Sequence, residues 1–480
     1  MKDILTELMD YLKGKGVSYA DARYEEHEEQ QIVVENDTLK SVSTSEDRGV
    51  GIRVLYEGGW GFASTNRLNK DALFKAAERA LEIARESAKR SEGVELAPED
   101  PHVDTFRSPF EKDPFEVPIS EKVDLLKAAT KEMMKVEGVK RAIGSMDFRR
   151  IRKVFVSTEG SQIDQLIVIS GSGIVAYAAD ENDFQWRSYP SSFGGDYATR
   201  GWEFVLEMDL PGNARKVAEE AAALLKADEI EPGEYDIVID GQQMALQVHE
   251  SCGHPTELDR VFGYEISFAG GSFLQPDKLN KLRYGSEIVN ITADATIPGG
   301  LGSFGYDDEG VKAQKSYLVK DGVFVGYLMD RQTAAKLGLR SNGAARAQSW
   351  RHIPIIRMTN INLLPGEHSL DDLIGGIDYG FLLATNKSWS IDDMRVNFQF
   401  ATEIAYEIKG GKLTGKIFKN PVYYGRTTEF WNSCDGIASE EYWHVWGVPN
   451  CGKGQPQQVM YVGHGTSPAR FRKVKVGVAR

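Results

Sequence analysis

The chain has 480 residues, 41% hydrophobic and 27% charged, and is long enough to bury a sizeable core in two or three domains. Its 57 Lys and Arg against 71 Asp and Glu give a net charge of −14, which argues against a nucleic-acid-binding protein. No apolar run approaches the roughly 18 residues of a membrane span, and the first residues lack the plan of a signal peptide.

The first 230 residues are expected to alternate helices with strands. Residues 3–16 have the spacing of an amphipathic helix ended by glycines, and residues 20–65 alternate polar and apolar side chains as antiparallel hairpins do. The charged, proline-containing stretch 93–118 predicts a surface loop, and strands are expected from about residue 139 to about residue 205. Three further stretches have helical periodicity, the second with a Ser/Glu capping pattern: 70–91, 120–138 and 214–227.

The composition changes at the acidic Pro-Gly stretch 228–236, where we place a domain boundary. Residues 235–240 predict a buried strand and 241–253 a short helix, followed by glycine-rich loops and many short strands. The predicted fold class is α+β, with two domains. The N-terminal domain, 1–230, combines an antiparallel sheet with long helices, and the C-terminal domain, 231–480, is mostly β and carries a short metal-binding helix.

The segment HESCGH (249–254) holds two histidines five residues apart, one more than in the H-E-x-x-H motif of zinc peptidases. On a regular helix such positions point about 140° apart, so the imidazoles converge on one metal only if the helix breaks between them. Gly253 and Pro255 provide the break, because glycine can turn left-handed at a helix end and proline cannot continue the helix. This pattern predicts that His249 and His254 bind a metal beside Glu250. The alternative is a helix end at which both histidines cap carbonyl groups.

A catalytic zinc generally has three protein ligands, so a third must come from elsewhere in the chain. Cys451 has the cation Lys453 two residues away, which would favour the thiolate form that metals bind. His464 lies in a glycine turn, where a lone histidine more often hydrogen-bonds to backbone. The candidates for the third ligand are Cys451, His464, His444, Asp307 and Asp308.

The chain has three cysteines. A count that is both low and odd is typical of proteins in a reducing cytoplasm and does not indicate a disulfide framework. Cys252 lies between the two histidines, but helical geometry turns it away from His249, so we expect it to pack in the core. Cys434 has no partner in the sequence and is also expected in the core.

The segment HESCGHPTELD (249–259) resembles the H-E-x-x-G-H-x-x-E-x-D segment of the TldD branch of the PmbA/TldD metallopeptidase family. Ser251-Cys252 replaces the smaller or apolar pair of the family, and residues 339–350 depart from its usual S-T-G-N-G-R-R type of pattern, which leaves substrate preference open. Further stretches resemble family blocks in the family's order, so that the resemblance covers nearly the whole chain: 51–65, 301–338, 357–367 and 450–456.

The resemblance implies a cytoplasmic peptidase that binds one divalent metal, zinc or alternatively iron, through His249, His254 and Cys451, with Glu250 as general base. The implied substrates are unfolded peptides or small, loosely folded proteins, with no direct nucleic-acid or membrane partner. PmbA/TldE-like sister proteins lack these four residues and pair with the active subunit. The chain is therefore expected to be the catalytic member, as a homodimer or as a heterodimer with such a sister.

Two other functions remain open from the sequence: a non-catalytic, PmbA/TldE-like peptide-binding subunit, and a metal-dependent amidohydrolase acting on a non-peptide substrate. Glu257 is equally suited to orient a metal ligand or to cap the next turn. The acidic run 306–310 is suited to bind a peptide amine or a lysine in a cleft, although a surface turn is slightly favoured. The strands and glycine-rich loops predict a groove in which an extended peptide adds as another strand.

Overall fold

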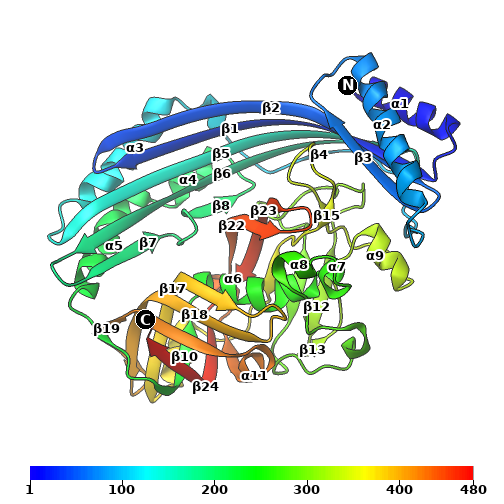
Figure 1. The fold of residues 1–480 in the computed structure, drawn as a ribbon. Helices are drawn as coiled ribbons and strands as arrows, with labels where there is room; N and C mark the ends of the chain where they lie inside the picture. The colour runs from blue at the N-terminus through cyan, green and yellow to red at the C-terminus, as the bar shows by residue number, and fades with distance from the viewer. Residues whose placement is uncertain (479–480) are drawn as a thin grey trace.

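The computed structural model describes residues 1–478 and has the predicted α+β fold, built around two eight-stranded sheets (Figure 1). The first sheet has the order β3-β2-β1-β5-β6-β4, and β7 and β8 also pair with β6. Its longest strands have 19 residues and span about 60 Å at roughly 3.3 Å per residue. The strands are β1 (Tyr19–Glu35), β2 (Thr38–Tyr56), β3 (Gly59–Thr65), β4 (Val103–Arg107), β5 (Val139–Ser157), β6 (Gln162–Ala179), β7 (Phe184–Tyr189) and β8 (Asp196–Ala198).

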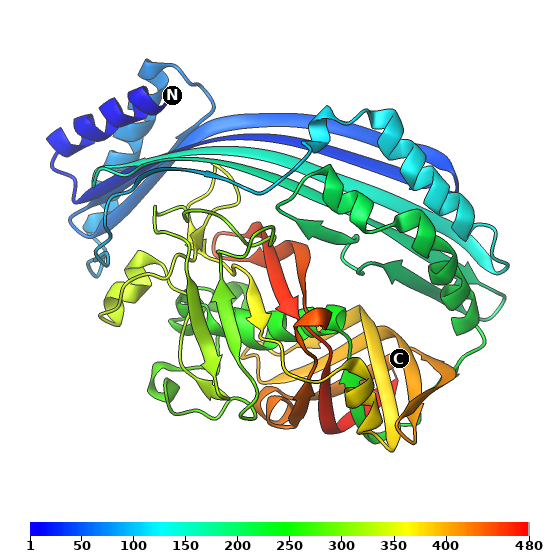
Figure 2. The ribbon, with the colours of Figure 1, turned by 180° about the vertical axis from the view of Figure 1, so that it is seen from behind.

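Two groups of helices cover the two ends of this sheet, each over its own hydrophobic core (Figure 2). At one end are α1 (Lys2–Gly14) and α2 (Lys70–Ala88). At the other end are α3 (Ile119–Met133), α4 (Trp202–Glu207) and α5 (Leu210–Leu224). The sheet arches between these ends over the C-terminal half of the chain, so its concave side faces the rest of the molecule (Figure 1).

The predicted helices are present, but two local predictions are wrong. Helix α3 begins after Pro118 with no side-chain cap, and Ser120 lies within its first turn and not at its N-cap. The stretch 93–118 is not entirely a loop, because it contains β4, which pairs in parallel with the first residues of β6 and forms an end of the sheet. This pairing satisfies backbone groups that an edge strand otherwise exposes.

In the second sheet, five strands close a ring, since each pairs with the next and the last pairs back to the first. These are β17 (Tyr379–Ile391), β10 (Gly233–Ile239), β24 (Ala469–Val478), β20 (Pro421–Arg426) and β18 (Asn397–Lys409). The remaining strands of this sheet are β19 (Lys412–Lys419), β9 (Asp228–Glu229) and β21 (Cys434–Ile437).

The smaller sheets lie beside the ring and, in the case of the hairpin of β22 (His444–Lys453) and β23 (Gln458–Thr466), between the ring and the arch (Figures 1 and 2). The others are formed by β11 (Ile291–Asp294), β12 (Lys315–Lys320), β13 (Val323–Phe324) and β16 (Ile361–Leu363), and by β14 (Ala345–Arg346) and β15 (Ile355–Ile356). The helices of this half are α6 (Gly241–Val248), α7 (Leu258–Val261), α8 (Ile266–Ala269), α9 (Arg331–Lys336), α10 (Leu370–Gly375) and α11 (Thr427–Asn432).

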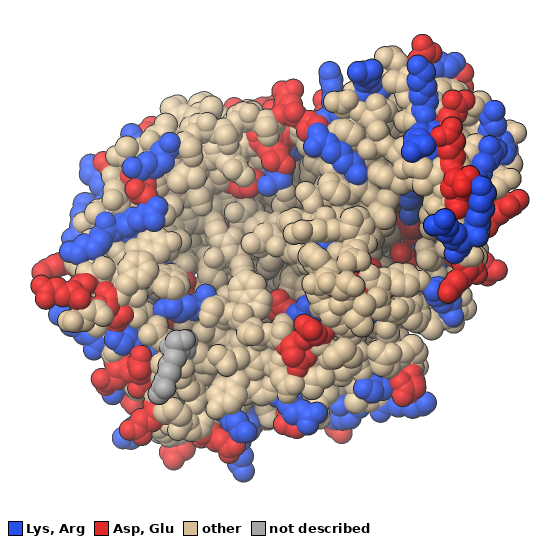
Figure 3. All heavy atoms as spheres, viewed as in Figure 1, with Lys and Arg blue, Asp and Glu red and all other residues tan. Residues whose placement is uncertain are grey.

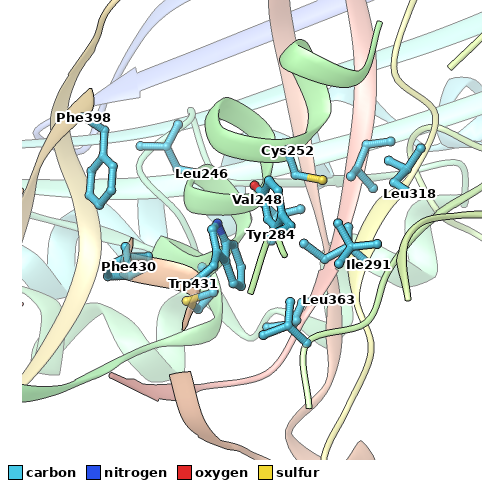
Figure 4. Close-up of a cluster of buried hydrophobic side chains, with 14 of the residues drawn as sticks. Leu246, Val248, Cys252, Tyr284, Ile291, Leu318, Leu363, Phe398, Phe430 and Trp431 are labelled. Carbon is cyan, nitrogen blue, oxygen red and sulfur yellow. The ribbon is translucent and has the colours of Figure 1, made fainter. Parts of the chain in front are cut away.

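The largest hydrophobic core lies around α6 and extends over both the ring and the smaller sheets (Figure 4). Leu246 and Val248 of α6 are part of it, and so is Cys252, as predicted; Cys434 is also buried there. No helix among residues 1–478 is long and apolar enough to cross a membrane.

Candidate metal centre

Helix α6 follows β10 directly and is buried along its whole length. The Asp240 carboxylate caps its start by accepting a hydrogen bond of 2.8 Å from the backbone N–H of Gln243. The Gln243 amide donates to the Tyr423 hydroxyl, which donates to Gln247, both over 2.9 Å. Because buried polar groups need partners, these bonds fix the rotation of the helix and therefore the direction in which its C-terminal end points.

The helix continues into a π-helical turn over His249–Gly253, in which the backbone N–H of His254 donates to the carbonyl of His249. This wider turn brings residues five apart onto one side, with the two imidazole centroids 4.9 Å apart and the ring planes at 86°. The predicted left-handed turn is wrong, since Gly253 has φ −56° and ψ −66°. A Cβ at this position would lie 2.4 Å from the sulfur of the buried Met358, so a larger residue would require that side chain to move.

Cys451 on β22 lies next to the two histidines, with its Sγ 3.7 Å from Nε2 of His254. The ligand atoms of His249, His254 and Cys451 all lie within 4.8 Å of one another, and each residue is at most 5% exposed. A tetrahedral zinc with ordinary Zn–N and Zn–S bonds separates nitrogen from sulfur by about 3.6 Å. The three side chains therefore fit a single zinc-sized ion.

The structure gives the other candidate ligands different partners. His444 pairs through Nε2 with Asp196 at 2.6 Å. Asp307 accepts hydrogen bonds from three backbone N–H groups, and Asp308 accepts from Lys153 at 3.0 Å. The acidic run is buried between the first sheet and the C-terminal half, so the favoured surface-turn interpretation is wrong.

His464 supports His249 from behind. Its Nδ1 lies 3.1 Å from the carbonyl oxygen of Ile361, and its Nε2 lies 2.8 Å from Nδ1 of His249. A carbonyl only accepts, so His464 carries its proton on Nδ1 and accepts from His249 through Nε2. Burial and the neighbouring His249 hold the pKa of His464 well below its usual value, which keeps it neutral. The Nε2 lone pair of His249 is thereby left for a metal.

His254 is supported by charged groups instead. Its Nδ1 donates to Glu257 over 2.9 Å, so Glu257 orients the imidazole. The Glu257 carboxylate lies 3.8 Å from Nζ of Lys453, which is 2.6 Å from both oxygens of Asp259. Burial acts to raise the pKa of Glu257, but Lys453 and His254 outweigh it and lower the pKa to about 2. Glu257 is therefore ionised.

Cys451 is stabilised as a thiolate, although not in the predicted way. Burial acts to raise the pKa of this thiol, but His249, His254 and Arg357 outweigh it and hold the pKa well below its usual value. Lys453 is paired with Asp259, and the cation near Cys451 is Arg357, which donates to the carbonyl oxygen of Cys451.

Glu250 is also buried in the centre and pairs with a residue that the sequence did not single out. Its Oε2 accepts a hydrogen bond of 2.7 Å from Nη1 of Arg395, in the turn between β17 and β18. Burial acts to raise the pKa of Glu250, but Arg395, His254 and His249 outweigh it and lower the pKa, so the carboxylate is ionised. Arg395 lies 145 residues from Glu250, and no local motif marks it.

Proteins named as metalloproteases are similar to this chain over almost its whole length. A metalloprotease of Methanothermobacter thermautotrophicus is 32% identical over 461 residues, which cover 96% of each chain. A zinc metalloprotease TldD homolog of Saccharolobus solfataricus is 25% identical and covers 96% of this chain and 97% of its own. The crystal structure of TldE from Thermococcus kodakarensis has the same fold, with a TM-score of 0.71, 17% identity and coverage of 98% of this chain and 100% of that one.

Three consecutive segments match domains of the PmbA/TldA metallopeptidases: domain 1 over residues 20–84, the central domain over 112–227 and the C-terminal domain over 232–478. The chain belongs to the PmbA/TldD metallopeptidase family. A metalloprotease-type function follows from this membership and agrees with the grouping of two histidines and a cysteine.

Proposed function

We propose that this protein is a zinc-dependent peptidase that hydrolyses unfolded peptides or small, loosely folded proteins. His249, His254 and Cys451 would hold the ion, and Glu250 would act as general base. The convergence of these three ligand atoms in a buried site beside an ionised glutamate carries the proposal. Two imidazoles and a thiolate suit zinc, and a relative named as a zinc metalloprotease supports this choice over iron.

The residues of the site have distinct roles in the proposed reaction. A bound zinc would polarise the scissile carbonyl and lower the pKa of water. Arg395 binds Oε2 of Glu250, so Oε1 is the oxygen placed to take a proton from the attacking water. The protonated Glu250 can then return that proton to the leaving amine, which restores the carboxylate. His464 and Glu257 hold the two ligand imidazoles in the required tautomers.

We also propose that the protein works in the cytoplasm as a dimer, either with itself or with a TldE-like subunit. The three cysteines are unpaired in the structure, which agrees with a reducing compartment. The TldE structure supports the second form of dimer, because such a sister subunit has the same overall fold as this chain. Mass measurement in solution, with and without a TldE-like protein, tests both forms; a monomer fully active on long peptides would contradict them.

The variant Glu250→Gln tests the catalytic proposal. Glutamine has nearly the same shape and its amide oxygen can still accept from Arg395, so the metal content should remain at one ion per chain. Cleavage of an unstructured peptide should fall by about 10²–10⁴-fold, because the amide cannot take the proton from water. Cleavage at the parental rate with metal bound would remove Glu250 from the mechanism.

A further inference from the structure

A cavity lies close to the metal centre, between the N-terminal region and the C-terminal half. Its volume is about 430 Å³, within the range of roughly 300–1,000 Å³ that is typical of small-molecule pockets. Figure 3 shows the surface hollowed right of centre, below the region of α2, with acidic and basic atoms inside the hollow. The proposed mechanism does not use this cavity.

The walls of the cavity are mostly apolar. Trp60 and Phe62 of β3 form one side, and Ile353, Pro354 and Ile355 form another. The Trp60 indole is fixed by its hydrogen bond to Gln332, at 3.0 Å, and by the guanidinium of Arg53, which lies 4.7 Å from the ring centroid. Such walls suit the aliphatic stem of a long side chain.

The polar groups of the cavity leave one negative charge without a cation. Glu309 pairs with Arg53 at 3.0 Å, and Asp259 pairs with Lys453 at 2.6 Å. Asp330 also lines the cavity, and among residues 1–478 no cation forms an ion pair with it. Its Oδ1 caps α9 by accepting from the backbone N–H and the hydroxyl of Thr333, both at 2.7 Å, and within residues 1–478 no group donates a hydrogen bond to Oδ2.

The electrostatics of Asp330 agree with a missing cation. Burial, followed by the neighbouring Glu309, raises the pKa of Asp330 to about 7, so its negative charge is costly where it stands. A cationic ligand group would stabilise that charge. The apolar walls select a cation at the end of a hydrocarbon chain over a small hydrated ion.

The cavity is connected to the metal centre through the residues that support it. Asp259 lies on its wall and binds Lys453, which is 3.8 Å from Glu257, the partner of the ligand His254. Gly454, also on the wall, is three residues beyond Cys451. A peptide lying across the metal centre could therefore direct a nearby side chain into the cavity.

We propose that this cavity is a specificity pocket for a lysine or arginine side chain of the peptide substrate, with its stem against Trp60 and Phe62 and its charge at Asp330. The inference rests on the proposed peptidase function, because it assigns the substrate class to that same site. It also places one end of the acidic run, Glu309, beside the substrate.

The experiment compares two unstructured peptides that differ only by lysine or norleucine at a single position. The lysine peptide should have the higher kcat/KM, and Asp330→Asn should reduce the lysine-to-norleucine ratio about tenfold, as expected for one hydrogen bond to a charged group. Asparagine is as good an N-cap as aspartate, so α9 should remain intact. Asp209→Asn, at the N-cap of α5 far from the cavity, is the matched control and should leave the ratio unchanged.

A second variant tests the cavity without removing the acid. Ile83 lies on α2 at the edge of the cavity and is half-buried, so Ile83→Lys would bring a tethered cation to Asp330. This cation should compete with the substrate lysine and lower the same ratio. Equal cleavage of both peptides by the parent protein, or an equal ratio in Asp330→Asn and Asp209→Asn, would overturn the proposal.

Binding to the Glu250→Gln protein separates this inference from the peptidase proposal, because it needs no turnover. Fluorescence anisotropy of the labelled peptides should give a Kd about tenfold lower for lysine than for norleucine, and Asp330→Asn should abolish the difference. If no peptide is cleaved by the parent protein, the peptidase proposal fails and binding alone decides: a lysine preference supports the pocket, and equal Kd values overturn it.

Discussion

The two histidines of the candidate metal centre are held in opposite electrostatic environments. On the His464 side, His249 donates to a neutral imidazole, which in turn donates to the Ile361 carbonyl. On the Glu257 side, His254 donates to an ionised carboxylate backed by Lys453 and Asp259. Both sides fix the same tautomer, with the proton on Nδ1 and Nε2 toward the centre. The geometry of the ligands can thus be set by either kind of partner.

The difference lies in charge. A carboxylate raises the basicity of the imidazole that it accepts from, whereas a neutral partner only orients it. Burial lowers the pKa of His254, but Glu257 and Cys451 outweigh it and raise the pKa to about 9. We therefore expect Glu257 and its charged partners to contribute more than His464 does to metal affinity and to local stability.

The largest effect is expected from His249→Ala, which removes a ligand. Bound metal should fall from one ion per chain to near zero, and peptide cleavage should be lost with it. Cys252→Ala is the matched control: it lies in the same helix end, but its side chain packs in the core, so metal content should be unchanged. Elemental analysis after gel filtration measures both. Full metal content in His249→Ala would remove this residue from the ligand set.

Lys453→Met is expected to have a smaller effect, a loss of folding stability. The substitution leaves the carboxylate of Asp259 buried without its cation and removes one of the cations beside Glu257, and breaking such a buried pair costs about 3–5 kcal/mol. The free energy of unfolding of the metal-free protein in denaturant measures this. Lys89→Met removes an exposed pair with Glu86 and should cost at most about 1 kcal/mol. Equal losses of unfolding free energy in the two variants would show that the buried pairs of Lys453 contribute no more to stability than an exposed ion pair.

The smallest effects are expected on metal affinity, from variants that change the partner of one ligand histidine at a time. Glu257→Gln should weaken metal affinity by about 10–100-fold, because the imidazole loses its charged acceptor. His464→Gln replaces one neutral acceptor by another and should fall at the lower end of that range. Competition with a chromogenic chelator measures both affinities. A larger loss in His464→Gln than in Glu257→Gln would reverse the comparison.

The regular elements of the fold could be predicted from the sequence because their periodicity is local. Helix α2 and the hairpin of β1 and β2 lie where the spacing of apolar residues predicts them. Strand β4 was missed because its pairing with β6, more than 50 residues away, decides its conformation. The division of the chain at residue 230 stays a prediction.

The candidate site could likewise be predicted from the sequence only where its signal is local. The HESCGH segment predicts a metal site from local spacing, and the structure brings Cys451 to both histidines. The π-helical turn was not foreseen, because a glycine and a proline at a helix end favour a left-handed turn, whereas Gly253 keeps helical backbone angles. The pairs of Glu250 with Arg395 and of Lys453 with Asp259 span 145 and 194 residues, so no motif in a single sequence marks them.

X-ray absorption spectroscopy at the zinc edge of the purified protein tests the central claim most directly, because it reports the atoms that hold the ion. We expect one sulfur at about 2.3 Å together with nitrogen ligands at about 2.0–2.1 Å. The sulfur contribution should disappear in Cys451→Ala and remain in Cys434→Ala. Zinc bound with only nitrogen and oxygen ligands in the parent protein would contradict the set of His249, His254 and Cys451.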